Sequence, residues 1–179
     1  AASQKDMARN SDVPLMRCPS DITEPTFELY AESANSGHHA KSSAAGADAS
    51  ASLVRLPTAN YAGVFGTLEA DDSFPAPQGD GPIVSARRIR FQDLERGLSH
   101  TILVGERTMA MVPTTWFGVN FRGEDAACRL VGSAMTAPSC DFCDECEFGS
   151  RHPAGANFVW GDGHVSLVSR DIDANEYQR

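Results

Sequence analysis

The chain has 179 residues, and its 24 acidic and 15 basic side chains give it a formal net charge of −9. This length suits one domain with a sizeable core. The acidic balance argues against nonspecific binding to nucleic acids or anionic membranes, because both need a basic protein surface. No run of residues approaches the roughly 18 apolar side chains of a membrane-spanning helix. These properties predict a soluble protein, and its net negative charge suits contact with divalent cations.

The first part of the chain offers few strong patterns. Residues 1–10 are polar and show no signal peptide, so we expect a mature or trimmed chain. Leu15–Cys18 favours a short strand, and Ser20–Asp21 favours a turn capped by a side chain. Residues 33–52 are rich in Ala, Ser and Gly without an apolar period, which predicts a flexible loop inserted into the domain. The pair His38–His39 lies in this loop, as solvated side chains or as metal ligands.

An acidic loop follows the clearest strand of the N-terminal half. The strand is Asn60–Gly66, whose glycines indicate a bulge or a close backbone approach. The loop at residues 69–82 contains Asp71, Asp72 and Asp80, which can gather around Ca²⁺, an ion that binds several oxygens on a flexible loop. Their spacing does not match the regular twelve-residue calcium loop, so a solvated acidic loop is the alternative.

The middle of the chain predicts short elements that end at an acidic residue. Ile83–Val84 favours a short strand, and residues 87–96 carry apolar side chains at helical spacing. Gly97 suits the left-handed conformation that ends a helix. Thr101–Val104 predicts a buried strand. Glu106 follows it, either as a hydrogen-bonded structural acid or as a metal ligand.

The third quarter of the chain and its last residues are less regular. Met109–Phe121 favours two strands joined by a turn. Residues 122–147 have no clear period and contain four of the five cysteines, which predicts a Cys-rich insertion. Ser169–Arg179 is polar and predicts a tail or a frayed helix.

The cysteines allow disulfides, a metal site or redox chemistry; they are Cys18, Cys128, Cys140, Cys143 and Cys146. In an exported protein they would form two disulfides and leave one thiol, and the sequence does not choose among the pairings. Thiolates two residues apart can instead wrap Zn²⁺, with a fourth ligand from another cysteine or from His152. Acidic neighbours raise the thiol pKa and argue against a redox pair. Disulfides are the favoured prediction and Zn²⁺ is the alternative.

The C-terminal region predicts a β-hairpin. Asp162–Gly163 tolerates positive φ angles in a tight turn and lies between two apolar runs. A two-residue loop pairs Trp160 with Val165. It likewise pairs Phe158 with Leu167, and all four side chains then share one face. A slip of one residue would mix apolar with polar side chains, so the register is predicted to be well specified.

No catalytic motif accompanies this hairpin. His152 and His164 flank it and can approach a common ion together with Asp162, but the turn already explains Asp162, and each histidine can bond to backbone. The sequence contains no nucleophile elbow, no His-Glu-x-x-His or Ser-x-x-Lys motif, no phosphate-binding loop with lysine and no dinucleotide fingerprint. The sequence therefore predicts a protein that is not an enzyme.

Four segments resemble one bacterial family. His152, nine residues and then Asp162–Gly163 resemble the His-x(9)-Asp-Gly signature of a prepilin-like family related to type II secretion G-like pseudopilins. Arg17–Asp21 looks like the Cys-Pro-Ser-Asp motif of that family, and Asn60–Gly63 like its Asn-Tyr segment. Leu98–Glu106 is similar to its Thr-Ser-Asn-Thr segment, which ends in Gly-Glu. The segments keep the family's order and cover most of the chain.

Two departures from the family limit what the resemblance carries over. Arg96–Gly97 and His100 stand where the family has Asp-Gly and Asn, so no ligand role is transferred there. The prepilin cleavage site and the long N-terminal apolar helix are absent from this chain. That helix anchors precursors in the inner membrane and packs filament cores, so we expect a globular head alone, or a relative that assembles differently.

The resemblance implies an α+β, β-rich fold over residues 1–179: a pilin-like antiparallel sheet with long loops and a C-terminal hairpin, outside the cytoplasm. It implies a non-enzymatic subunit of a secretion or surface assembly that contacts itself or other secretion and surface proteins. Membrane attachment would occur only through the absent helix, and Ca²⁺ on the acidic loop follows from G-type pseudopilins. The alternatives are a cell-surface metal- or carbohydrate-binding module, and a hydrolase whose site is assembled from distant residues.

Overall fold

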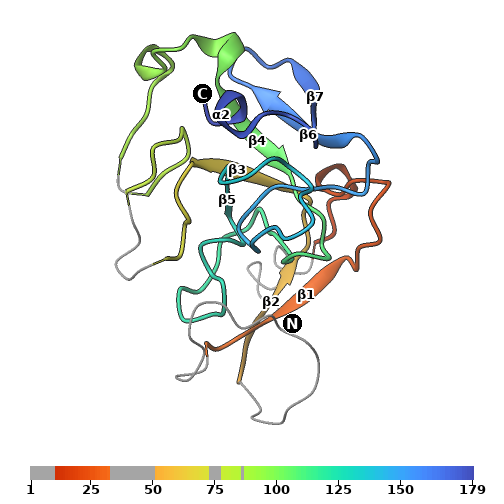
Figure 1. The fold of residues 1–179 in the computed structure, drawn as a ribbon. Helices are drawn as coiled ribbons and strands as arrows, with labels where there is room; N and C mark the ends of the chain where they lie inside the picture. The colour runs from red at the N-terminus through yellow and green to blue at the C-terminus, as the bar shows by residue number, and fades with distance from the viewer. Residues whose placement is uncertain (1–10, 33–50, 73–77, 86) are drawn as a thin grey trace.

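The computed structural model of the chain has an α+β, β-rich fold of two sheets with little helix (Figure 1). It describes residues 11–32, 51–72, 78–85 and 87–179. Within those ranges, none of the helices has the length and apolar character that a membrane span requires. The predicted loop at 33–52, with its pair His38–His39, lies outside the described residues except for its last two positions, and the second of these begins a strand.

The smaller sheet is an antiparallel pair, β1 (Thr26–Tyr30) and β2 (Ser52–Pro57). Side chains alternate along β1, so Phe27 and Leu29 are buried while their neighbours are more exposed. Leu56 of β2 completes this small core. Neither strand was predicted, because each apolar run is short.

The larger sheet has the strand order β5-β3-β4-β6-β7 (Figure 1). Its strands are β3 (Tyr61–Gly66), β4 (Ile102–Glu106), β5 (Val131–Ser133), β6 (Gly155–Trp160) and β7 (Val165–Ser169). Neighbours pair antiparallel except β3 and β5, which are parallel. The strands predicted around residues 60–66 and 101–104 and the C-terminal hairpin are confirmed.

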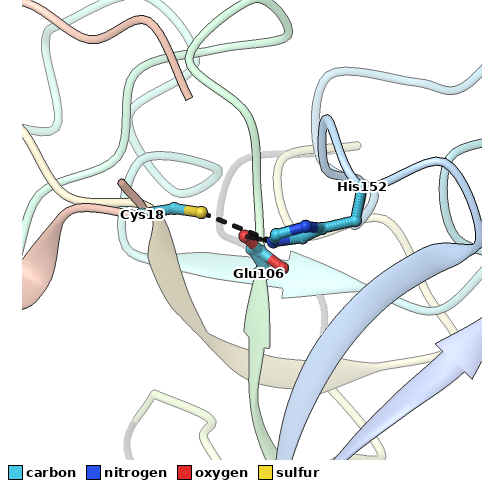
Figure 2. A group of neighbouring side chains, drawn as sticks. All are labelled: Cys18, Glu106 and His152. Carbon is cyan, nitrogen blue, oxygen red and sulfur yellow. Dashed lines mark hydrogen bonds and ion pairs between the residues drawn. The ribbon is translucent and has the colours of Figure 1, made fainter. Parts of the chain in front are cut away.

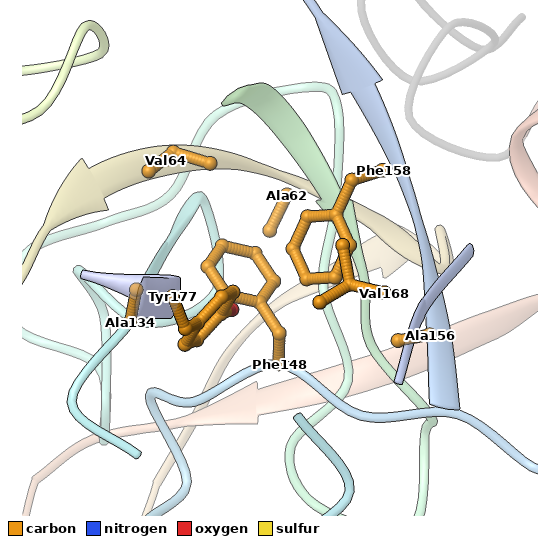
Figure 3. Packing of buried hydrophobic residues seen from close by; sticks show 8 residues of the cluster. All are labelled: Ala62, Val64, Ala134, Phe148, Ala156, Phe158, Val168 and Tyr177. Atoms are coloured by element: carbon orange, nitrogen blue, oxygen red, sulfur yellow. The ribbon is translucent and has the colours of Figure 1, made fainter. Parts of the chain in front are cut away.

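The main core lies on one face of this sheet (Figure 3). Phe158 of β6 meets Phe148 edge to face at 5.3 Å between ring centroids and Tyr177 at 5.9 Å. Tyr177 belongs to the short helix α2 (Ala174–Tyr177), whose first turn is capped by the Asp173 carboxylate. The terminal segment therefore forms a short helix that is capped and packed on the sheet, whereas the sequence predicted a tail or a frayed helix.

The hairpin is present, but the predicted register is wrong by one residue. Val159 pairs with Val165 and Phe158 with Ser166. Phe158 therefore lies on the core face, whereas Val165 and Leu167 lie on the other face and are 62 % and 45 % exposed. The apolar set that was predicted to share one face is thus divided between two faces.

The turn chemistry explains the shift. The Gly163 N–H donates to the Trp160 carbonyl, and the Trp160 N–H donates to the His164 carbonyl. Three residues, Gly161 to Gly163, thus form the loop instead of two. Gly163 has a φ of +89°, as expected of the last residue of a three-residue hairpin loop.

Several short predicted elements do not form. Leu15–Cys18 is not a strand, because Pro14–Met16 makes a 3₁₀ turn that proline at its first position favours. Ile83–Val84 is not a strand either. Ile83 donates one hydrogen bond to the carbonyl of Val64, but the preceding Pro82 has no N–H with which to extend a ladder.

The helix predicted at residues 87–96 is reduced to the 3₁₀ turn Phe91–Asp93, because Phe91 is 65 % exposed and no apolar face is buried to stabilise a longer helix. A second 3₁₀ turn follows Gly97, whose φ of +86° agrees with the prediction of a left-handed backbone. The two strands predicted at residues 109–121 are absent; one isolated bridge joins Ala59 to Thr114 there.

Candidate functional site

The four segments that carry the family resemblance meet in one buried polar cluster. Asn60 is fully buried in one of them, and it bonds to a second, Arg17–Asp21, and to Arg107, the residue that follows the third. Its Oδ1 accepts the backbone N–H of Cys18 at 2.9 Å. Its Nδ2 donates to Asp21 Oδ2 at 2.7 Å and to the carbonyl of Arg107 at 2.9 Å. One amide side chain therefore ties the N-terminal segment to the end of β4.

Asp21 extends the cluster to Arg151, the residue before His152 of the fourth segment. Its carboxylate accepts hydrogen bonds from the Met109 N–H at 2.8 Å, from Thr108 Oγ1 at 3.0 Å and from Arg151 Nε at 2.7 Å. Burial raises the pKa of Asp21, but the bonds from Met109 and Arg151 outweigh it and hold the pKa below its ordinary value. Asp21 is therefore ionised and fixed at neutral pH.

Beside this cluster, Cys18, Glu106 and His152 point toward one another from three separate segments (Figure 2). Cys18 Sγ lies 3.5 Å from His152 Nε2, and Glu106 Oε1 lies 3.2 Å from the same nitrogen. The cysteine and the glutamate are buried, at 6 % and 1 % exposure, and the His152 side chain is 28 % exposed. The group is thus reached from solvent on the histidine side.

Local structure positions each of the three side chains. Glu106 ends β4, and its second oxygen accepts both the backbone N–H and the side-chain Nδ2 of Asn157 at 3.0 Å. The His152 N–H donates to Ser150 Oγ at 2.9 Å, in the turn before β6.

Burial, followed by the hydrogen bond with Glu106, raises the pKa of the Cys18 thiol. Burial, and then the negative charges that Cys18 and Glu106 carry at the high pH where tyrosine titrates, also raise the pKa of Tyr61.

This geometry differs from that of a thiol protease. In a nucleophile–base–carboxylate relay, the thiol and the carboxylate contact opposite nitrogens of the imidazole ring. Here the thiol of Cys18 and the carboxylate of Glu106 face the same nitrogen of His152. The raised pKa also keeps the thiol protonated at neutral pH. Sulfur, nitrogen and oxygen atoms that converge on one point suit metal coordination better than proton relay.

A family model described as "Protein of unknown function (DUF1559)" matches residues 1–175. The chain belongs to this family. The match agrees with the expectation of a prepilin-related protein. No curated protein and no solved structure matches the chain.

In this DUF1559 protein, the two halves of the His-x(9)-Asp-Gly signature lie apart. His152 precedes β6 and Asp162–Gly163 follows it, so a strand about 20 Å long separates them. Asp162 instead pairs with His164, with Oδ1 at 2.6 Å from Nδ1. Hydrogen bonds from the His164 backbone and from Ser99 lower the pKa of Asp162 to about 2. His152 and His164 are therefore not brought to one ion.

The aspartates predicted for Ca²⁺ do not form a ligand group in the described part of the chain. The Asp80 carboxylate accepts the N–H and the Oγ1 hydroxyl of Thr67, both at 2.7 Å. Asp71 Oδ1 lies 3.1 Å from Cys146 Sγ. No group of three or more His, Cys, Asp or Glu side chains found among the described residues contains Asp72 or Asp80. Calcium binding stays a prediction.

Four of the cysteines form disulfides, as the favoured prediction held. Cys128 pairs with Cys146 and Cys140 with Cys143, at Cα–Cα distances of 4.8 and 5.2 Å. All five cysteines lie in described segments, and Cys18 remains a buried thiol. Two disulfides indicate that the DUF1559 protein folds in an oxidising, extracytoplasmic environment.

Sequence patterns indicated the members of the polar cluster but not their meeting. The sequence predicts Glu106 as a structural acid or a metal ligand. It offers Cys18 and His152 only as a possible fourth ligand for Zn²⁺ at the distant cluster Cys140–Cys146. Asn60 and Arg107 carried no chemical prediction. Cys18, Asn60, Glu106 and His152 each lie in a different one of the four family-like segments, and this is the signal that could have joined them.

Proposed function

We propose that the chain is the head of a pilin-like subunit, which acts outside the cytoplasm as a structural or assembly component and not as an enzyme. The observation that carries this proposal is the polar cluster around Asn60, in which the four family-like segments meet. It joins the segments by fixed hydrogen bonds, as a scaffold requires. The family match over residues 1–175 supports the same class, and the His-x(9)-Asp-Gly signature supports a relation to type II secretion G-like pseudopilins.

The edge strand β7 is the surface through which such a head would meet an identical neighbour or another assembly protein. No strand of the described residues pairs with its outer edge, because β7 is the last strand of the sheet. Val165 and Leu167 project from it and are largely exposed. Unpaired backbone beside apolar side chains favours the addition of a further strand.

Self-association of the chain tests this surface. We expect light scattering over a range of concentrations to show reversible dimers or larger assemblies, and Val165→Lys or Leu167→Lys to weaken them at least tenfold. Phe121→Lys is the matched control, because it changes an apolar side chain that is 69 % exposed elsewhere. A chain that stays monomeric at millimolar concentration, or variants that all assemble alike, would count against β7.

The pilin relation itself is tested in the gene. We expect the codons before Ala1 to encode a prepilin leader and an apolar helix, and the full product to fractionate with the cell envelope. The proposal would be contradicted if those codons encode a different domain, or if the full product stays in the cytoplasm. The same proposal includes Ca²⁺ binding to the acidic loop, and calorimetric titration of the chain with Ca²⁺ should detect it.

A metal-binding role is the second candidate function. The convergence of the Cys18, Glu106 and His152 side chains is the observation that favours it.

A further inference from the structure

Three different donor atoms occupy one small volume at the edge of the polar cluster. The thiol of Cys18, a carboxylate oxygen of Glu106 and a ring nitrogen of His152 all lie within 4.8 Å of one another. Two of the separations are 3.5 and 3.2 Å. Ligand atoms on a tetrahedral zinc ion, with bonds of about 2.0–2.3 Å, lie about 3.3–3.8 Å from each other. The spacing found here is therefore close to that of a zinc site.

The surrounding protein fixes these donors in the way that metal ligands are usually fixed. The outer oxygen of Glu106 accepts two hydrogen bonds from Asn157. The backbone of Cys18 is bonded to Asn60, and that of His152 to Ser150. Hydrogen bonds to a ligand side chain, as at Glu106, orient the ligand and strengthen metal binding, and the two backbone bonds hold the segments that carry Cys18 and His152 in place.

Of the three candidate ligand groups in the described ranges, this is the group with an available thiol. The groups Cys140–Cys143–Glu147 and Asp71–Cys128–Cys146 both contain cysteines that are joined in a disulfide. A disulfide sulfur is not a thiolate ligand, so those groups need a reductant before they can bind zinc. Cys18 needs none.

We propose that Cys18, Glu106 and His152 bind one Zn²⁺ ion, which names the metal and the ligands of the second candidate function and does not depend on the pilin-like role. The thiol loses its proton to solvent and binds through Sγ, neutral His152 binds through Nε2, and Glu106 binds through a carboxylate oxygen. Zinc accepts this mixture of sulfur, nitrogen and oxygen and does not oxidise the thiolate, whereas Ca²⁺ takes oxygen ligands. Zinc has a fourth coordination position, which water or a donor from a partner would fill, and the group is reached from solvent on the side of His152, whose side chain is 28 % exposed.

Zinc affinity of the full chain, prepared without an affinity tag and stripped with a chelator, tests the site. We expect one equivalent of Zn²⁺ to bind with micromolar or tighter affinity in competition with a chromophoric chelator. His152→Ala and Cys18→Ser should each weaken binding at least tenfold. The matched control is His164→Ala, because His164 also pairs with a carboxylate but lies at the far end of β6. This variant should bind zinc as the wild-type chain does.

A second measurement keeps the test decisive if Cys18→Ser fails to fold. Co²⁺ in place of Zn²⁺ should give a thiolate-to-cobalt absorption band in the wild-type chain and in a Cys140→Ser/Cys143→Ser double variant. Binding weaker than micromolar, binding unchanged in His152→Ala, or loss of the cobalt band in the double variant would each overturn the proposal. His152→Ala is expected to fold, since its side chain is partly exposed.

Discussion

At the scale of single residues, Asn60 contributes more to this protein than its neutral side chain suggests. It is 0 % exposed and makes three hydrogen bonds to two segments that are far from it in the sequence, Cys18–Asp21 and Arg107. Buried polar groups stabilise a fold only when each has a partner, and the loss of one partner leaves the others unsatisfied. The cluster is therefore sensitive to the loss of this one amide.

Asn60→Ala is expected to lower the free energy of unfolding by about 2–4 kcal/mol, because it leaves the Cys18 N–H and the Arg107 carbonyl without this partner. Chemical denaturation measures the change. Asn120→Ala is the matched control, since Asn120 is exposed and accepts one local bond from the Arg122 N–H. Equal effects of the two substitutions would contradict the role given to Asn60.

Asp71 provides a test of pH dependence. Burial, and then the nearby negative charges of Glu69 and Asp125, raise its pKa from 3.8 to about 7. A raised folded-state pKa adds stability below pH 4 that is lost as the pH rises through 7. The largest penalty this shift allows is about 4 kcal/mol, and partial exposure reduces it to about 1–3 kcal/mol.

Asp71→Asn should therefore become more stable relative to the wild-type chain between pH 4 and pH 8. Denaturation midpoints across that range measure the trend. Asp72→Asn removes the same charge from the exposed neighbouring residue. An equal pH-dependent gain in both variants would show that burial at Asp71 is not the cause.

At the scale of elements, the C-terminal hairpin shows what alternation of apolar residues can and cannot predict. The apolar runs and the Asp-Gly pair placed the strands and the turn, but a loop of three residues moved every cross-strand pair by one. The observed register places Trp160 beside His164, whose rings stack at 5.4 Å, and lets Trp160 Nε1 donate to Ser166 Oγ at 2.7 Å. The alternation of apolar and polar residues does not fix the register of this hairpin, and side-chain contacts of this kind do.

Gly163→Ala should lower the free energy of unfolding by about 1–2 kcal/mol. The backbone there has a φ of +89° with open space around the Cα atom, so the penalty is conformational strain and not a clash. Gly163→Asn should lower it less, because asparagine enters this region more readily. Thermal unfolding compares the two. An alanine variant as stable as the asparagine variant would contradict the three-residue loop.

At the scale of the whole molecule, the elements that the sequence predicted correctly are strands of the larger sheet. Ladders of backbone hydrogen bonds hold these strands, and their apolar residues form a recognisable pattern in the sequence. Residues 107–130 have almost no regular structure, and side chains hold them instead. The guanidinium of Arg107 is 0 % exposed, and it donates to the carbonyls of Cys128, Val131, Cys146 and Glu147. No period or motif encodes bonds between side chains and distant carbonyls, so this region, like the meeting of the four segments, could not be derived from the sequence pattern.

The segment at residues 107–130 also connects the two sheets, which makes a prediction about cooperativity. Arg107 holds the Cys128 carbonyl of this segment beside the larger sheet. Gly123 of the segment forms a bridge with Ala31 next to β1, and the Arg129 guanidinium lies 5.2 Å from the centroid of the Phe27 ring. Trp160 reports on the larger sheet, and Trp116 lies beside Phe117, which packs on the core of the smaller one. In variants that keep a single tryptophan, both probes should give the same denaturation midpoint, because Asn60 and Arg107 join the regions that surround them.

Arg107→Lys should separate the two midpoints while preserving the positive charge, since a lysine cannot reach four carbonyls in the planar fork of a guanidinium. Burial lowers the pKa of Arg107 to about 10, so the native side chain is still charged at neutral pH and the comparison isolates geometry. Arg55→Lys, which changes a largely exposed arginine paired with Glu28 on the smaller sheet, is the control. Coincident midpoints in Arg107→Lys would mean that the two sheets are coupled by apolar contact alone.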